Sequence, residues 1–410
     1  MELEYNFPNL PELNNLKILV SNDNGRIKTS LHGSYSMRTW FFIKVYFTFH
    51  EKVGSLANYK GSRVPSMYIP PIPSVPHARI LESYLASALF KKLIPQAVTI
   101  GVTTACQLQC VHCSAKGRSK TVPILTTDEL KQVTRDCIDL GVPNITFTGG
   151  EPLLRADLEE IIASVPPEQA ITLVFTNALG LTAQRAKQLK ESGLFGVHIS
   201  LDSVNPSEHD RLRGLKGSFQ SVREGVKNAL DAGLLVGIST YVTREKALKH
   251  DILPIADLCA QWGVHEMTVF DAIQTGELKE QKDITLNKSA RKILLGDSKR
   301  INKKYKGKLR VVTQTWTNSG LGFSRFIGCL AANLQFHITA QGDFAPCDFT
   351  PLTFGNIREE PLKKLWEKIL QHPAYCYRKQ SCRMQDPDFR KKYIDTIPKD
   401  ADLPYPISKL

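Results

Sequence analysis

Three cysteines in one short loop carry the clearest chemical signal in the sequence. Cys106, Cys110 and Cys113 are spaced C-x3-C-x2-C, and they follow an apolar run at residues 98–102 that is rich in β-branched side chains. Such a run is typical of a buried strand, so we expect the thiols on the loop at its carboxyl end, where active sites of α/β folds lie. Thiolates favour zinc or iron-sulfur clusters. Three cysteines on a four-iron cluster would leave one iron free to bind a small molecule.

The cysteine loop alone leaves two other interpretations open, namely a group of buried, redox-inert thiols or a zinc knuckle completed by His112.

A second motif favours a functional site. Residues 146–152 read Thr-Phe-Thr-Gly-Gly-Glu-Pro. The glycines Gly149 and Gly150 let a backbone approach a ligand closely, and Glu151, followed by Pro152, offers a carboxylate to an amino group. A simple turn at a strand end is the alternative.

The elements that would position these motifs alternate between strand and helix. Strands are predicted at residues 98–103, 144–148, 171–176, 196–201, 235–242 and 265–270, and helices at 127–140, 156–164, 182–192, 218–232, 251–262 and 287–304. This alternation indicates a parallel sheet with crossover helices. The predicted fold class is α/β, a partial (β/α)6 TIM-like barrel.

The cysteine loop after the first strand and Gly149-Gly-Glu-Pro152 after the second resemble the radical S-adenosylmethionine (SAM) superfamily over residues 98–272. The resemblance implies a [4Fe-4S] cluster on the three cysteines, whose open iron chelates the amino and carboxylate groups of SAM. One-electron reduction then cleaves SAM to methionine and a 5′-deoxyadenosyl radical, which takes a hydrogen atom from a substrate. It also implies an electron donor such as flavodoxin or ferredoxin.

Further cofactor-binding residues follow from the resemblance and from their place in the predicted fold. Asn177, Ser200 and Asp202 fall at the ends of the third and fourth strands, where related enzymes approach the ribose and methionine portions of the cofactor. His112 sits where the family often has an aromatic residue near the adenine, and Arg213 resembles a basic residue that can meet the cofactor carboxylate. Capping or turn roles are the alternatives. No general base can be assigned.

A second group of cysteines follows near the C-terminus. A hairpin turning at residues 341–342 is predicted to carry one of them at its far end, and the region resembles the shortened "twitch" form of the SPASM domain, which holds one auxiliary [4Fe-4S] cluster. The resemblance implies Cys329, Cys347 and Cys382 as ligands, with Cys376 as a fourth, and a free Cys376 would leave one iron open. Structural zinc is the alternative. Cys137 and Cys259 fall within helices and are expected in the core.

Residues 1–95 differ in character from the rest of the chain. A hairpin is predicted at 16–31 with its turn at Asn24-Gly25, followed by an aromatic stretch at 40–49, a proline-rich strap at 64–76 and a helix at 77–94. The aromatic stretch is shorter than the roughly 20 residues that span a bilayer. It fits a half-buried strand or an amphipathic segment that packs on the barrel or docks on a membrane or partner. We therefore expect three regions: 1–95, 96–305 and 306–410.

Composition narrows the class of protein. Nine cysteines in 410 residues are too few for a disulfide scaffold, so metal ligation in a reducing compartment is favoured. No signal peptide is apparent, which predicts a cytoplasmic protein, with peripheral membrane contact as an alternative. The net charge of +13 would suit an anionic partner, but solvated basic helix faces explain it equally, and no nucleic-acid motif accompanies it.

The sequence thus predicts a radical SAM enzyme, with an auxiliary cluster that favours redox conversion of a peptide or cofactor precursor. The first alternative is a radical SAM enzyme acting on a lipid or other membrane-borne substrate, suggested by residues 40–49 and the basic surface. The second is a non-catalytic metal-binding or nucleic-acid-binding protein.

Overall fold

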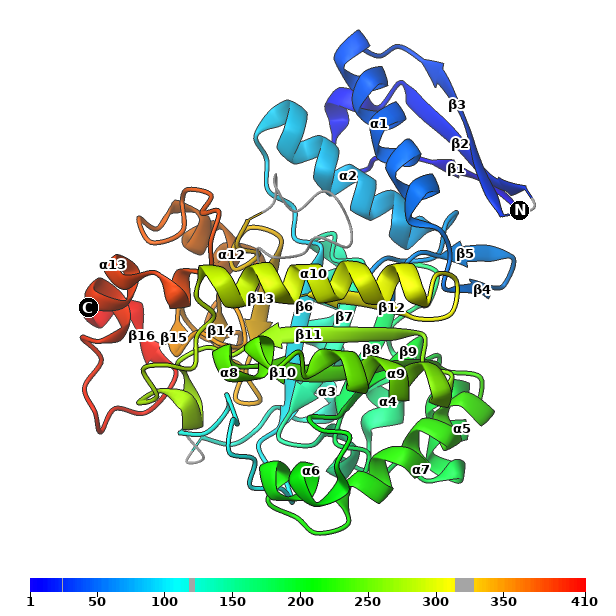
Figure 1. Ribbon diagram of the computed structural model, residues 1–410. Coiled ribbons are helices and arrows are strands. Elements are labelled where there is room, and N and C mark those ends of the chain that lie inside the picture. Colours follow the sequence, from blue (N-terminus) through cyan, green and yellow to red (C-terminus); the bar gives the residue numbers. More distant parts are fainter. Residues whose placement is uncertain (24, 118–121, 314–327) are drawn as a thin grey trace.

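A single large sheet organises the molecule. The computed structural model describes residues 1–23, 25–117, 122–313 and 328–410. Within them, nine strands lie in the order β12-β11-β10-β9-β8-β7-β6-β13-β14 (Figure 1). All neighbours are parallel except β13 and β14. The central strands are β6 (Ala97–Thr103), β7 (Asn144–Gly149), β8 (Ile171–Thr176), β9 (Gly196–Ser200), β10 (Leu235–Val242) and β11 (Glu266–Asp271).

Helices connect and cover these strands. They are α3 (Thr127–Asp139), α4 (Leu158–Ala163), α5 (Ala183–Glu191), α6 (Pro206–Arg213), α7 (Ser218–Asp231), α8 (Arg244–Leu248), α9 (Ile252–Trp262) and α10 (Lys288–Lys304). The predicted α/β class and barrel are confirmed, and all six predicted strands lie within one residue of the observed bounds. The short helices α6 and α8 were not predicted. Only His209 and Leu212 of α6 are buried. The helix therefore needs no apolar periodicity, which is the signal that predicts a helix from sequence.

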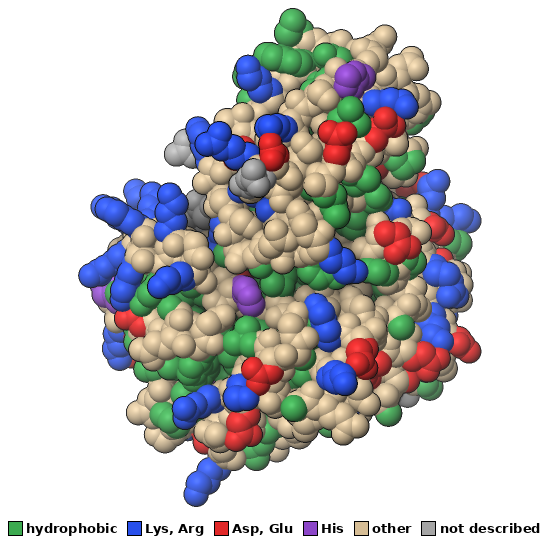
Figure 2. Space-filling view, turned by 90° about the vertical axis from the view of Figure 1, so that its right-hand side faces the viewer, with side chains coloured by type: hydrophobic (Ala, Val, Ile, Leu, Met, Phe, Trp, Pro, Cys, Tyr) green, Lys and Arg blue, Asp and Glu red, His purple; other side chains and the backbone are tan. Residues whose placement is uncertain are grey.

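The N-terminal region is a separate module of strands and two helices. An antiparallel sheet of β1 (Glu2–Tyr5), β2 (Leu16–Asp23) and β3 (Arg26–Gly33) packs against α1 (Met37–Val53) and α2 (Val75–Phe90). The predicted hairpin is confirmed, since Asp23 pairs with Arg26; Asn24 lies outside the described residues. Figure 2 shows the module as a lobe above the larger body of the molecule.

The aromatic stretch at 40–49 forms part of α1 and is not a strand. Ser36 caps the helix by accepting a hydrogen bond from Thr39 N, and the buried face carries Ile43, Tyr46 and Phe47. The sequence left strand and helix open because aromatic residues suit both, and the burial of this face within the module favours the helix.

The proline-rich strap closes the amino-terminal end of the barrel. After the short hairpin of β4 (Ala57–Tyr59) and β5 (Ser62–Val64), Val64 and Met67 pack against Leu173, Phe195 and other barrel residues. The carbonyl of Tyr68 accepts a hydrogen bond from Asn144 Nδ2 at 3.2 Å. The strap therefore joins the module to the floor of the barrel.

The C-terminal region extends the same sheet. β12 (Arg310–Thr313) pairs with β11, and β13 (Gln335–Ile338) pairs with β6, so the sheet runs across the boundary expected near residue 306. β13 and β14 (Phe344–Ala345) form the predicted hairpin. The remaining elements are β15 (Leu352–Thr353), β16 (Tyr405–Pro406), α12 (Leu362–Gln371) and α13 (Pro387–Phe389). No helix among the described residues is long and apolar enough to cross a bilayer.

Candidate active site

The cysteine loop follows β6 and is fixed by backbone contacts from three other loops. Gly150 N and Glu151 N, after β7, donate to the carbonyls of Thr103 and Ala105 at 2.7 and 2.8 Å. Gln109 N donates to Arg213 O at 3.2 Å, and Glu277 N donates to Cys113 O at 3.0 Å. These bonds leave the three thiols available for a ligand.

Glycines make the close approach of these loops possible. A Cβ atom on Gly150 would lie 2.1 Å from Ala105 O, and one on Gly149 would lie 2.3 Å from Thr103 O. A Cβ on Gly276 would lie 2.1 Å from Cys113 O. The sequence interpretation that Gly149 and Gly150 permit close backbone contact is consistent with this geometry, and the contact is with the cysteine loop itself.

All three cysteines of the loop line one cavity of about 470 Å³, which runs from the carboxyl ends of the strands through the barrel to Ala97 and Asn144 at their amino-terminal ends. Burial raises the pKa of the Cys106 and Cys110 thiols, and Arg213 opposes this at Cys110, where Nη1 lies 3.8 Å from Sγ. Among the residues that the structure describes, no three His, Cys, Asp or Glu side chains converge as ligands of a single metal ion do. Three thiols on one cavity wall are a donor set that fits an iron-sulfur cluster, whose irons bind separate cysteines.

Glu151 lines the cavity but its carboxylate is held by the protein. Oε1 accepts hydrogen bonds from Thr176 Oγ1 at 2.7 Å and Leu153 N at 3.1 Å, and Oε2 accepts one from Asn177 N at 2.8 Å. The side chain is buried, and burial raises its pKa. Glu151 therefore ties the ends of β7 and β8 together beside Pro152, and its direct contact with an amino group stays a prediction.

His112, Asp202 and Arg213 form a buried group beside the cysteine loop. Asp202 Oδ2 lies 2.7 Å from Arg213 Nε and 3.4 Å from His112 Nε2. The cationic side chains, led by Arg213, hold the pKa of Asp202 below its usual value despite its burial. Burial lowers the pKa of His112 to about 4, so the imidazole is neutral. Its ring stacks on Tyr241 at 3.9 Å between centroids.

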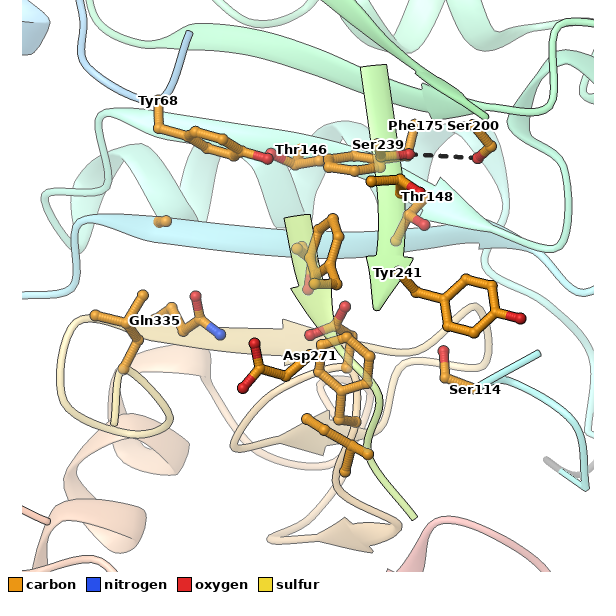
Figure 3. Close-up of a pocket in the computed structure, with 18 of the residues that line it drawn as sticks. Tyr68, Ser114, Thr146, Thr148, Phe175, Ser200, Ser239, Tyr241, Asp271 and Gln335 are labelled. Carbon is orange, nitrogen blue, oxygen red and sulfur yellow. Dashed lines mark hydrogen bonds between the residues drawn. The ribbon is translucent and has the colours of Figure 1, made fainter. Parts of the chain in front are cut away.

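The remaining sequence-predicted residues also face this cavity. Asn177 Nδ2 lies 4.0 Å from Cys106 Sγ. Ser200 and Ser239 share a hydrogen bond of 3.4 Å between their hydroxyls, marked in Figure 3. The structure thus brings together the predicted positions from the ends of β6 to β9.

The cavity also has walls that sequence reasoning did not identify. Figure 3 shows Tyr68 and Gln335 toward one end and Tyr241 and Ser114 toward the other. The aromatic lining residues are Tyr46, Phe49, Tyr68, Tyr84, Phe175, Tyr241, Phe270 and Phe349. Tyr241 and Asp271 lie at the ends of β10 and β11. Their positions could have identified them as lining residues from the sequence, since the strand ends of a parallel barrel meet at one edge. The lining residues of the N-terminal module could not be identified in this way, because they do not follow barrel strands.

Three C-terminal cysteines lie together in a second site. Cys329, Cys347 and Cys382 are each 8% exposed. A hydrogen bond from the Cys382 thiol, together with the nearby Arg383, lowers the pKa of Cys329 and so favours its thiolate. Thiolate is the form that binds iron. These residues fit an auxiliary cluster.

Cys376 stands apart from this group. It is exposed, and its thiol lies 3.9 Å from Pro373 O. The structure therefore does not bring it to the other three cysteines. Its role as a fourth ligand stays a prediction, as do the other ligand assignments. Cys137 and Cys259 are fully buried in α3 and α9, as expected.

The barrel, the cysteine loop and the C-terminal cysteines define the class of protein. The profile of the radical SAM superfamily matches residues 100–259, and that of an iron-sulfur cluster-binding domain, SPASM, matches residues 329–390. The chain belongs to the radical SAM superfamily and carries a C-terminal SPASM domain. It is an enzyme, and its cofactors are SAM and [4Fe-4S] clusters.

The relatives carry the names of different enzymes. The AdoMet-dependent heme synthase of Nitratidesulfovibrio vulgaris is 28% identical over 286 residues, which are 65% of this chain and 77% of the relative. The probable GTP 3′,8-cyclase of Methanocella arvoryzae is 40% identical over 138 residues, 34% of this chain and 44% of that protein. These relatives support the enzyme class but differ in substrate.

Solved structures share the fold. Streptococcus suis SuiB bound to precursor peptide SuiA aligns with a TM-score of 0.56 at 17% identity, covering 85% of this chain and 84% of SuiB. The anSMEcpe protein with bound AdoMet aligns with a TM-score of 0.51 at 19% identity, covering 67% and 80% of the two chains. At this identity the likeness shows the fold alone.

Proposed function

We propose that this enzyme abstracts a hydrogen atom from a residue of a peptide substrate and that its auxiliary cluster takes part in a redox conversion of that residue. When bound, the cluster of the cysteine loop and SAM together supply the carbon radical that abstracts the hydrogen atom. The chain itself binds and orients the substrate and keeps water from the site. The proposal concerns only the substrate and outcome, since the enzyme class is established above.

The composition of the cavity beyond the cofactor end carries this proposal. Among the described lining residues, Arg213 is the one Lys or Arg, and it is already paired with Asp202. The far walls combine aromatic rings with the carboxylates of Asp271 and Asp348. Such walls suit a neutral or apolar side chain of a peptide better than a substrate with several carboxylates. SuiB and anSMEcpe, which share the fold, are reported with bound peptides.

The cavity also reaches both flanking regions. It is lined by Gly328, Leu330 and Phe349 from the C-terminal region, and by Tyr46 and Ile80 from the N-terminal module. A substrate bound beside Leu330 and Phe349 would lie near the second group of cysteines, because these residues are neighbours of Cys329 and Cys347 in the chain. That position suits an auxiliary cluster that accepts an electron from a substrate radical.

A tetrapyrrole cofactor precursor is the second candidate. The relatives named AdoMet-dependent heme synthase and Fe-coproporphyrin III synthase favour it, the latter from Methanosarcina barkeri with 26% identity over 311 residues. Lipids and other membrane-borne substrates have no comparable support from the relatives and solved structures named above.

Release of 5′-deoxyadenosine tests the two candidates directly. The reconstituted, reduced enzyme is given SAM with either a deuterated synthetic peptide encoded by a small reading frame adjacent to its gene or iron coproporphyrin III. We expect the peptide to stimulate release and to transfer deuterium into 5′-deoxyadenosine. Stimulation by the porphyrin alone would establish the second candidate. Basal release without stimulation by the peptide would reject that peptide as substrate.

A further inference from the structure

One wall of the active-site cavity comes from the N-terminal module. Tyr46, Phe49 and His50 of α1 line the cavity, as do Ile80 and Tyr84 of α2. Thus a region remote in sequence from the radical SAM core shares a cavity with its cysteines. A wall of this kind can recognise substrate without touching the cofactor.

His50 differs from the tyrosines of this wall because one of its ring nitrogens lacks a partner in the part of the chain that the structure describes. Its side chain is 3% exposed, and among the described residues its Nδ1 atom has no hydrogen-bond partner. Burial, together with the nearby guanidinium groups of Arg63 and Arg310, lowers its pKa to about 3. The imidazole is therefore neutral and can donate or accept one hydrogen bond without forming an ion pair. A buried polar atom without a partner is costly unless a ligand satisfies it.

Aromatic rings surround His50. The ring of Tyr46 lies edge-on at 4.5 Å between centroids, and that of Phe49 lies edge-on at 5.5 Å. His77 lies at 5.3 Å on a third side. These rings form an apolar surround for a planar group, since aromatic rings pack well edge-to-face.

The position of Tyr46 is fixed from behind by a buried network. Its hydroxyl lies 3.0 Å from His77 Nε2, and the hydroxyl of Tyr5 lies 2.8 Å from His77 Nδ1. Ser74 N donates to the Tyr5 hydroxyl at 3.3 Å. Because both nitrogens of His77 are engaged by tyrosines, the network holds α1 and α2 in place, and His50 is left outside it.

The charges near the wall are already compensated. Arg63 Nη1 lies 3.1 Å from Glu51 Oε1, and Arg310 donates to the carbonyl of Val53 at 2.6 Å and faces Glu266. The wall is therefore suited to binding an aromatic ring that carries a neutral polar atom, and less suited to binding a charged group.

We propose that His50 and the surrounding rings of Tyr46 and Phe49 form a substrate subsite for an aromatic group that carries a hydrogen-bonding atom, such as a phenol or an indole. This inference rests on the proposed peptide function and names the class of side chain that the peptide presents. In the subsite the ring packs on Phe49, and its polar atom pairs with His50.

Two fluorinated probes measure this recognition on the full chain with reconstituted clusters. Binding of 4-fluorophenol and of fluorobenzene is followed by fluorine NMR. We expect the phenol to bind more tightly, by roughly three- to tenfold, which is the range of one neutral hydrogen bond. The variant His50→Phe should abolish this preference while still binding fluorobenzene. Phe49→Ala should weaken both probes, and Phe41→Ala, on the exposed face of the same helix, should change neither.

Several outcomes would overturn the subsite. These are equal affinity of the wild-type chain for both probes, a phenol preference that survives His50→Phe, and loss of both probes in His50→Phe, which would make His50 a packing residue. Basal 5′-deoxyadenosine release is measured on the same samples. Failure of the peptide experiment with an intact phenol preference would reject the proposed substrate and leave the subsite standing.

Discussion

The guanidinium of Arg213 lies 2.7 Å from the carboxylate of Asp202, and the two side chains are 11% and 1% exposed. Asp202 follows β9 and Arg213 ends α6, so the pair fixes α6 against the barrel. The same helix end accepts the backbone hydrogen bond from Gln109 in the cysteine loop. One buried ion pair thus supports both the cofactor site and the fold around it.

Removing one member of this pair should destabilise the protein. We expect Arg213→Gln to lower the free energy of unfolding of the apo-protein by about 3–5 kcal/mol, because it leaves a buried carboxylate without its countercharge. Urea denaturation followed by circular dichroism measures this. Arg211→Gln is the matched control, since Arg211 pairs with Glu208 on the surface and such pairs contribute about 0–1 kcal/mol.

The double variant Arg213→Gln, Asp202→Asn separates the charge effect from packing. Since it removes both charges, it should recover a large part of the loss. A double variant no more stable than Arg213→Gln would show that the guanidinium acts by packing alone.

The close contact between Gly150 and the cysteine loop leads us to predict that a larger residue at this position would disturb the cluster site. A Cβ atom at Gly150 would lie 2.1 Å from Ala105 O, a backbone atom that cannot move without displacing the loop. Gly150→Ala should therefore lower the iron content of the site and abolish 5′-deoxyadenosine release. Gly296→Ala on α10 should keep both and add up to about 1 kcal/mol of stability, because a Cβ there meets nothing within 4 Å. Full iron content in Gly150→Ala would refute the steric argument.

Local sequence signals predicted the barrel and the cysteine loop well. The β-branched runs placed the strands, and the spacing of Cys106, Cys110 and Cys113 placed the loop at a strand end. The contacts of His50 and Tyr46 with the cavity could not be predicted, because they depend on how a module of some 95 residues docks on the barrel. The separation of Cys376 from Cys382 could not be predicted either, since it depends on the path of the loop between them.

A buried histidine should make stability depend on pH. His198 on β9 is fully buried between the rings of Tyr68 and Phe175, and burial lowers its pKa from 6.5 to about 3. Between pH 6.5 and pH 4 the unfolded chain binds a proton at this residue and the folded chain does not. Its contribution to stability is thus full above pH 6.5 and falls as the pH drops, by up to about 1.4 kcal/mol per pH unit.

The variant His198→Asn isolates this effect. The difference in unfolding free energy between wild type and variant should shrink as the pH falls from 6.5 to 4, measured by urea denaturation at each pH. Glu266, whose pKa burial raises to about 7, has the opposite dependence but is present in both proteins and cancels. A constant difference for His198→Asn would mean that this histidine is protonated in the folded protein.

Measuring the iron content of cysteine variants distinguishes the cysteines that bind iron from those that do not. A chain with two four-iron clusters holds about eight irons. Substitution of Cys106, Cys110 or Cys113 by alanine should remove about four of them and abolish 5′-deoxyadenosine release. Cys137→Ala, in the core of α3, should keep all eight. Retention of iron and activity in a loop variant would contradict the assignment of that cysteine.

The C-terminal cysteines should divide into two groups in the same assay. Alanine at Cys329, Cys347 or Cys382 should remove about four irons, because these buried thiols lie together. Cys376→Ala should keep them, because its thiol is exposed and lies against Pro373 O. The auxiliary cluster would then bind through three cysteines and leave one iron without a cysteine ligand. Loss of about four irons in Cys376→Ala would instead show that its loop folds inward when the cluster forms.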